Sequence, residues 1–198
     1  MNKIYLILAI LAGIFIALQV FIYFSTLKTE SQAYKVIEKI KGIEIRFYPP
    51  ANLAITHFSA NNYKDLGSLG FRKLAGYIFG GNREGRNIAM TSPVHMDIQD
   101  SGSSMAFVMP NNMDRKHLPE PNDSSIKIQT KPEEYVASIS FGGFASDAKI
   151  KIYEALLRKT LIEEGIPFSG SFRFLGYNPP YQLLGRRNEI IVSINWNP

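Results

Sequence analysis

The sequence contains no cysteine among its 198 residues. This absence excludes disulfide bridges, thiolate nucleophiles, and zinc or iron sites built on cysteine. Histidine is also scarce: the three residues are His57, His95 and His117, and no two have the close spacing of a metal site. Runs of basic residues are absent too, because the lysines and arginines behind the formal charge of +5 are scattered. Nucleic-acid binding needs a clustered basic face, so we expect no nucleic-acid partner.

What the sequence does have is a long apolar run over residues 4–24, in which Gln19 is the main polar residue. About 20 apolar residues are enough to cross roughly 30 Å of hydrocarbon as a helix. A cleaved signal peptide is the alternative, but its apolar core has about 7–15 residues and ends in small ones. This run ends in the bulky residues 20–24. We therefore expect residues 1–25 to be an uncleaved single-pass membrane anchor, with the rest of the chain on the extracytoplasmic side.

After the anchor, the sequence predicts a polar linker over residues 26–33 and then one domain over residues 34–198. Apolar residues that recur at every second position predict strands in that domain. These strands are expected at residues 34–40, 43–48, 53–58, 88–99, 105–109, 126–128, 135–141, 172–175, 181–184 and 190–195.

Two amphipathic helices are expected between the strands. Asn62 and Ser146 stand where a side chain caps a helix by accepting backbone N–H bonds. The first helix contains Gly67, Gly70 and Gly76. Each glycine costs up to about 1 kcal/mol relative to alanine, so we expect the missing side chains to serve close packing on a sheet or space for a ligand.

The domain also carries an internal repeat, which becomes visible when the sequence is shifted against itself by 83 positions. The pairs that then match include Ile43 with Ile126, Ile45 with Ile128, Ala54 with Ala137 and Phe58 with Phe141. The order of elements matches as well, which favours two halves at about residues 34–115 and 124–198. The expected fold class is α+β: a distorted antiparallel β-barrel from two repeated β-rich halves, each with one flanking helix, plus an N-terminal transmembrane helix.

No pair of carboxylates, and no histidine beside a nucleophile, marks a catalytic centre, so we expect a protein that is not an enzyme. The first helix instead places Arg72 and Lys73 beside Leu66, Leu69 and Tyr77. A flat apolar molecule with carboxylates suits that combination. The alternative is that the apolar residues belong to the core and the basic ones face solvent.

The same residues carry a resemblance to the SOUL/heme-binding protein family. The segments that resemble the family are residues 43–51, 70–82, 88–94, 141–144, 176–180 and 187–189. The resemblance implies a distorted β-barrel built from a duplicated unit flanked by two helices. It also implies binding of heme or another tetrapyrrole in a surface groove between the first helix and a loop of the second half, with basic residues near the propionates.

Carried over by that resemblance, the expected cofactor-binding residues are Leu66, Leu69, Arg72, Lys73, Tyr77, Phe174, Tyr177 and Tyr181. Some family members place a histidine after the position of Arg46, but Phe47 stands there in this sequence. The expected metal ligand is therefore His95, with His57 as the alternative. The predicted function is a membrane-anchored, non-enzymatic protein that binds or buffers heme. The alternative is a binding domain for another amphipathic small molecule, as in effector-binding domains that resemble the same fold.

Overall fold

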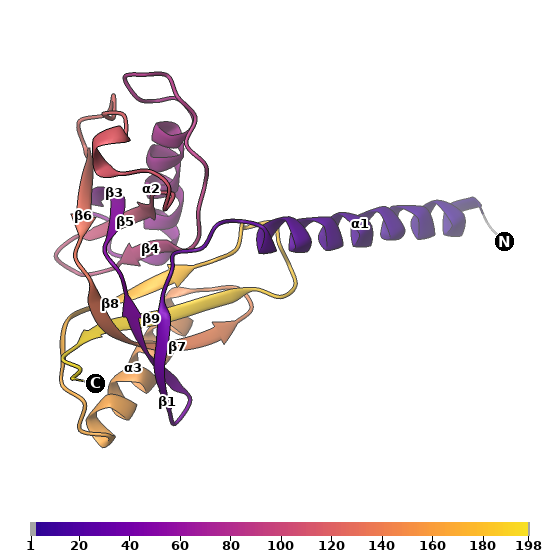
Figure 1. The fold of residues 1–198 in the computed structure, drawn as a ribbon. Coiled ribbons are helices and arrows are strands. Elements are labelled where there is room, and N and C mark those ends of the chain that lie inside the picture. Colours follow the sequence, from indigo (N-terminus) through magenta and orange to yellow (C-terminus); the bar gives the residue numbers. More distant parts are fainter. Residues whose placement is uncertain (1–2, 198) are drawn as a thin grey trace.

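A computed structural model of the chain describes residues 3–197 (Figure 1). These residues contain the helices α1 (Lys3–Leu27), α2 (Tyr63–Ile78) and α3 (Asp147–Glu163), and a short 3-10 helix η1 (Arg115–His117). The strands are β1 (Lys35–Ile40), β2 (Ile43–Tyr48), β3 (Ala51–Phe58), β4 (Val94–Asp97), β5 (Ser103–Val108), β6 (Ile126–Lys131), β7 (Glu134–Gly142), β8 (Phe168–Gly176) and β9 (Arg187–Ile194).

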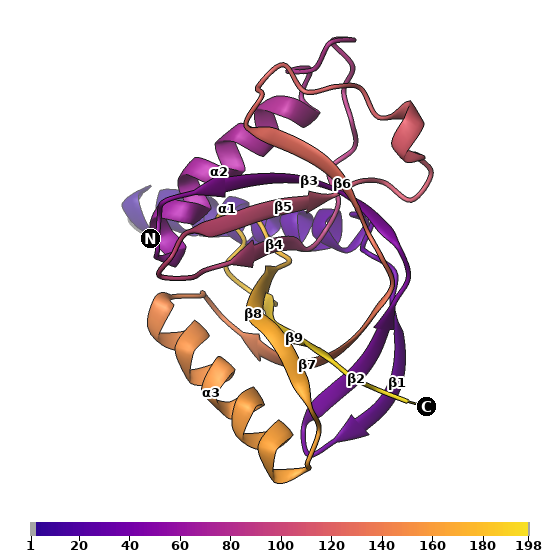
Figure 2. The ribbon, with the colours of Figure 1, turned by 90° about the vertical axis from the view of Figure 1, so that its left-hand side faces the viewer.

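All the strands join one antiparallel sheet in the order β1-β2-β7-β9-β8-β4-β5-β3-β6. The sheet is strongly curved (Figure 2), but the outermost strands, β1 and β6, do not pair with each other within residues 3–197. The predicted α+β class is confirmed, whereas the prediction of a closed barrel is wrong. Alternating apolar residues predict strands but not whether the first and last strands of a sheet pair, and among residues 3–197 β1 pairs only with β2 and β6 only with β3.

Both domain helices lie outside the curve of the sheet (Figure 2), with α2 against β3 and β5 and α3 against β7, β8 and β9. The predicted caps are confirmed, since Asn62 accepts from the N–H of Asp65 and Ser146 accepts from the N–H of Lys149. Each half of the domain thus carries one helix on its strands. The internal repeat itself stays a prediction.

One predicted strand is wrong, and another is shorter than predicted. Residues 181–184 form part of a loop, because Pro179 and Pro180 before them lack N–H groups and the loop bonds to α1 instead of to a strand. The segment 88–99 is a strand only at Val94–Asp97, directly after Pro93.

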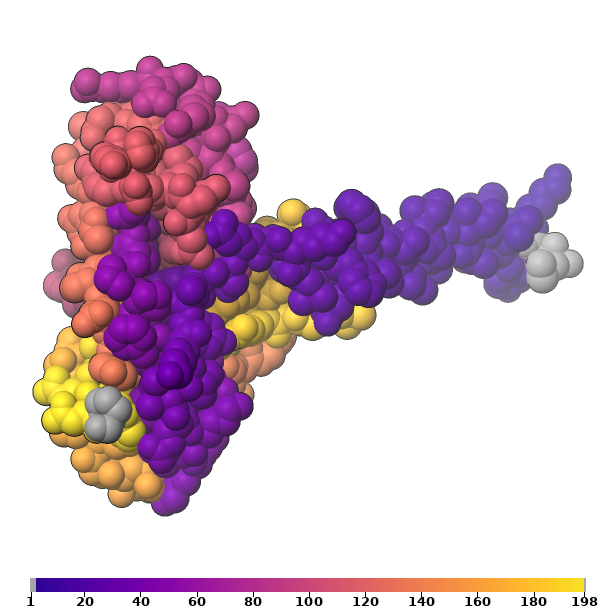
Figure 3. All heavy atoms as spheres, viewed as in Figure 1, coloured from indigo at the N-terminus to yellow at the C-terminus, as the bar shows by residue number. Residues whose placement is uncertain are grey.

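Helix α1 projects away from the domain (Figures 1 and 3) and none of its residues is buried. By length and composition it is the one candidate membrane span among residues 3–197, and a signal sequence near the N-terminus would meet the same criteria.

Candidate functional site

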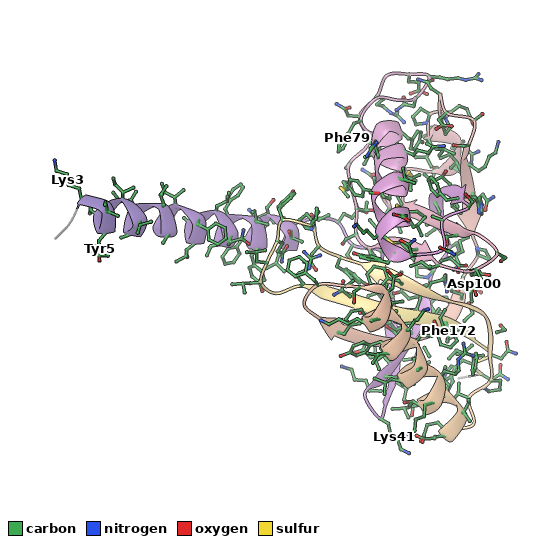
Figure 4. The ribbon with its side chains drawn as sticks, turned by 180° about the vertical axis from the view of Figure 1, so that it is seen from behind. Lys3, Tyr5, Lys41, Phe79, Asp100 and Phe172 are labelled. Carbon is green, nitrogen blue, oxygen red and sulfur yellow. The ribbon has the colours of Figure 1, made fainter. Side chains whose placement is uncertain are left out.

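The outer face of α2 carries an exposed stripe, which we call the α2 stripe and define as Leu69, Arg72, Gly76 and Phe79. These residues follow one another at helical spacing and therefore share one side of the helix. Leu69 is 47% exposed and Phe79 is 63% exposed. Phe79 projects from the end of α2 on the side of the domain from which α1 departs (Figure 4). The stripe is an apolar surface with a cation near its centre.

The two basic residues of α2 differ in their partners. Lys73 donates to the Ser125 hydroxyl at 2.8 Å and pairs with Asp123 at 3.5 Å. Arg72 is exposed, and among residues 3–197 it forms neither an ion pair nor a side-chain hydrogen bond. The Arg72 guanidinium is therefore free to accept a carboxylate in the bidentate geometry that arginine favours.

The three helix glycines meet different surroundings. A Cβ on Gly70 would lie 2.9 Å from the sulfur of Met105, so this glycine lets α2 pack closely on β5. A Cβ on Gly67 or Gly76 would have no atom within 4 Å. Gly76 leaves open space within the α2 stripe, where a flat group can approach the helix backbone. The expected close packing is confirmed at Gly70, whereas space for a ligand at Gly76 stays a prediction.

The structure divides the predicted cofactor-binding residues among several places. Leu66, Tyr77 and Phe174 lie in the core between α2, α3 and the sheet, and the Tyr77 hydroxyl donates to the Pro119 carbonyl at 3.0 Å. Leu69, Arg72 and Lys73 lie on the exposed side of α2. The spacing of residues along a helix shows which of them share a face, but not which face packs on the sheet. The predicted set of cofactor-binding residues therefore contains both core and surface residues.

The two predicted tyrosines of the second half lie apart from α2's exposed side. Tyr177 lies on the concave face of the sheet, where its hydroxyl donates to Glu189 at 2.8 Å. Tyr181 is 62% exposed on the loop between β8 and β9. The eight predicted residues therefore do not line one surface in this structure, and their role in heme contact stays a prediction.

His95 lies on β4 and is 6% exposed, on the concave side of the sheet. Its Nε2 lies 2.7 Å from the side-chain oxygen of Gln32. Burial and then the charge of Arg173 lower the pKa of His95 to about 3, so the ring is neutral at physiological pH. His95 borders a cavity of about 310 Å³ together with Leu53, Ile55, Ala106 and Arg173. This position lies across the sheet from the α2 stripe.

Residues 3–197 contain no group of three or more histidine, aspartate or glutamate side chains that could hold a metal ion. Heme iron needs only one or two axial ligands from the protein, so this finding does not test His95, whose assignment as a heme ligand stays a prediction.

The concave face carries a buried ion pair that the sequence did not single out. Arg46 donates to both carboxylate oxygens of Glu189, at 2.7 and 3.0 Å. Arg187, Ser140 and Tyr177 also donate to this carboxylate. Burial alone would raise the pKa of Glu189, but the hydrogen bonds and charges of Arg46 and Arg187 hold it at about 2. Because its oxygens are occupied, Glu189 stabilises the fold and has no free position for a ligand.

The only sequence signal for this buried ion pair is the alternation of apolar and charged residues along β2. Ile43 and Ile45 face the helices and Arg46 faces the other side, a pattern that usually indicates a solvent-facing charge. Here the curvature of the sheet encloses that side, so Arg46 is 2% exposed.

Comparison with known proteins agrees with this architecture. The chain is 32% identical to "Heme-binding protein 2" of Mus musculus over 155 residues, which are 74% of this chain and 75% of that protein. It is 35% identical to "Heme-binding protein 1" of Sus scrofa over 127 residues, 60% of this chain and 66% of that protein.

Among solved structures, the EcmrR C-terminal domain has a similar fold, with a TM-score of 0.59 and 12% identity over 83% of this chain and 99% of that one. The model of the SOUL heme-binding protein family matches residues 29–193. Since that match spans well over half of the sequence, the chain belongs to the SOUL heme-binding protein family.

Proposed function

We propose that the chain binds heme, or a closely similar tetrapyrrole, on the outer face of α2, and that it buffers or hands on this ligand without catalysing a reaction. Membership of the SOUL heme-binding family and the names of its relatives support the ligand class. The observation that carries the location is Arg72, an unpaired exposed cation between the apolar side chains of Leu69 and Phe79.

The α2 stripe fits the organic part of heme. Leu69 and Phe79 offer apolar contact to the flat ring, and Gly76 leaves the helix backbone open between them. Arg72 offers a charge-assisted hydrogen bond to a propionate. Bound heme would supply an iron centre, but His95 lies across the sheet with its Nε2 engaged by Gln32. The chain's own residues therefore hold the ring by contact and charge, and iron ligation from His95 is not part of this proposal.

We also propose that α1 anchors the chain in a membrane. Its length of 25 residues and its exposed apolar surface support a single span. Proximity to a membrane suits an amphipathic ligand, which partitions into lipid. The side of the membrane on which the domain stands is proposed to be the extracytoplasmic one, as the sequence predicts.

A hemin titration of the full chain in lipid nanodiscs tests the binding site. We expect a saturable Soret shift in the unchanged protein. Gly76→Leu should reduce the affinity about tenfold or more, because the new side chain occupies the open space in the stripe.

Gly67→Leu is the matched control for that experiment. It makes the same change in the same helix, and its Cβ also meets open space, but it lies on the opposite side of α2 from Gly76. Absence of saturable binding would contradict the function. A loss of affinity in Gly67→Leu alone would contradict the location.

A second candidate function is supported by the cavity on the concave face. Its volume of about 310 Å³ is enough for a small ligand, and Leu53, Ile55 and Ala106 give it apolar walls. A thermal-shift screen would identify such a ligand through its stabilisation of the folded state. Ala106→Leu narrows the cavity, so the stabilisation should disappear in that variant and persist in Gly76→Leu.

A further inference from the structure

The loop between β8 and β9, residues 177–186, lies against the last turns of α1 (Figures 1 and 3). The side-chain amide of Gln19 donates to the Tyr181 carbonyl at 3.3 Å, and its oxygen accepts from the Leu183 N–H at 3.1 Å. Gly185 approaches so closely that a Cβ there would lie 2.6 Å from the ring of Tyr23. The loop and the helix are therefore fitted to each other at two points.

These contacts fix the depth of the loop relative to any membrane that α1 crosses. The helix has 25 residues, Lys3–Leu27, and a span needs about 20 of them. Every stretch of that length within α1 contains Gln19. When the span ends as late as Leu27, Gln19 lies about 12 Å before its end at 1.5 Å per residue. A loop bonded to Gln19 must therefore reach the boundary of the hydrocarbon.

The exposed side chains of the loop suit that boundary. Tyr181 is 62% exposed, Leu183 43% and Leu184 73%. Phe144, which follows β7, is 50% exposed, and the guanidinium of Arg186 lies 4.4 Å from the centre of its ring. Tyrosine is enriched at membrane interfaces, and arginine can keep its charge at the headgroups while its stem lies in apolar surroundings.

Four backbone carbonyls of the loop accept hydrogen bonds from side chains. The carbonyls of Pro179 and Gln182 accept from Arg186, and the Leu184 carbonyl accepts from the side chain of Gln182. The Tyr181 carbonyl is satisfied by Gln19. Non-helical backbone is tolerated near hydrocarbon only when its polar groups are satisfied in this way.

We propose that Tyr181, Leu183 and Leu184, together with Phe144, insert into the interfacial layer of the bilayer that α1 crosses. This inference rests on the proposed membrane anchoring by α1. The loop satisfies the polar amide of Gln19, which would otherwise be costly within the span. The domain is thereby held in one orientation on the membrane surface, with the β8–β9 loop toward the lipid.

Single-cysteine labelling tests this proposal directly, because the natural sequence has no cysteine. The full chain is labelled at Leu184→Cys with an environment-sensitive fluorophore and reconstituted into phosphatidylcholine vesicles with or without lipids that carry a quenching nitroxide. Phe15→Cys in the middle of α1 is the control for the span. Ile162→Cys, 66% exposed on α3, is the control for a surface away from lipid.

We expect lipid quenching at Leu184→Cys and at Phe15→Cys, and none at Ile162→Cys. Adding Gln19→Leu should lower the quenching at Leu184→Cys about twofold or more, since the loop loses its contact with α1. Quenching at Phe15→Cys with none at Leu184→Cys overturns the insertion of the loop and leaves the anchor standing. No quenching at Phe15→Cys overturns the anchor itself. Quenching at Leu184→Cys by hemin, but not by lipid, would assign the loop to the ligand and overturn the proposal.

Discussion

The two sides of the curved sheet differ in the burial and pairing of their arginine side chains. On the concave side, Arg46 and Glu189 are almost completely buried and bond to each other at 2.7 and 3.0 Å. On the helix side, Arg72 is exposed beside Leu69 and has no charged partner among residues 3–197. A charge whose hydrogen-bonding positions are filled stabilises the fold, whereas an unpaired charge beside apolar surface can bind a ligand. The two sides therefore differ in whether the arginine has a charged partner, and not in whether they carry charge.

The largest expected effect is the loss of stability when the buried ion pair on the concave side is removed. Glu189→Gln leaves the buried Arg46 guanidinium with only the partly exposed carboxylate of Glu44 as a charged partner. Loss of the buried carboxylate should lower the free energy of unfolding by about 3 kcal/mol. Urea denaturation of the full chain in detergent measures this loss. Glu154→Gln is the matched control, because its pair with Arg158 is solvent-exposed and should be worth less than about 1 kcal/mol. Equal stability of the two variants would contradict a structural role for Glu189.

A second prediction concerns pH and the same side of the sheet. His95 stays neutral in the folded protein because its pKa is lowered to about 3 from 6.5. Below pH 6.5 the unfolded chain binds a proton that the folded chain does not, so stability should fall as the pH falls from 6.5 toward 3. The slope approaches about 1.4 kcal/mol per pH unit below pH 6.

The contribution of His95 can be isolated with two variants. His95→Gln should remove this part of the slope, whereas the exposed His57 offers the control His57→Gln, which should keep it. Denaturation midpoints measured between pH 7 and pH 5 make the comparison. The same slope in all three proteins would show that His95 titrates alike in the folded and unfolded chain.

On the helix side, the expected effects are smaller and concern the affinity for hemin. Arg72→Glu should weaken hemin binding about tenfold or more, through loss of a charge-assisted hydrogen bond and repulsion of the propionate. Lys73→Glu makes the same charge change one residue away, but Lys73 is already engaged by Asp123 and Ser125. We expect a smaller loss of affinity in that variant. If the two losses were equal, net charge would explain the effect and Arg72 would have no specific role.

Local features of the fold could be predicted from the sequence. The caps at Asn62 and Ser146 depend on bonds to residues three positions away, so the signal lies within one short segment. Contacts between distant segments could not be predicted. Arg46 and Glu189 are separated by 143 residues, and they meet only because β2 and β9 both pair with β7.

The candidate site was predictable to a similar extent. The apolar and basic residues of α2 were recognised as a group, but helical spacing gives no information on which side the sheet covers. In the structure, Leu66 and Tyr77 are core residues. Gly76 and Phe79, which the sequence prediction did not include, belong to the exposed α2 stripe. The local pattern of residues 181–184 predicts a strand, but these residues form a loop bonded to Gln19, which is more than 160 residues away in the sequence. A local pattern cannot show such a contact.

The most direct test of the central claim is the position of bound heme relative to the two sides of the sheet. A fluorophore at Ser68→Cys on the exposed side of α2 and one at Gln129→Cys beside the concave-face cavity report the two places. Heme quenches a nearby fluorophore through energy transfer, more strongly at shorter distance. We predict stronger quenching at Ser68→Cys when hemin binds to the full chain. Stronger quenching at Gln129→Cys would place the ligand on the concave side and contradict this account.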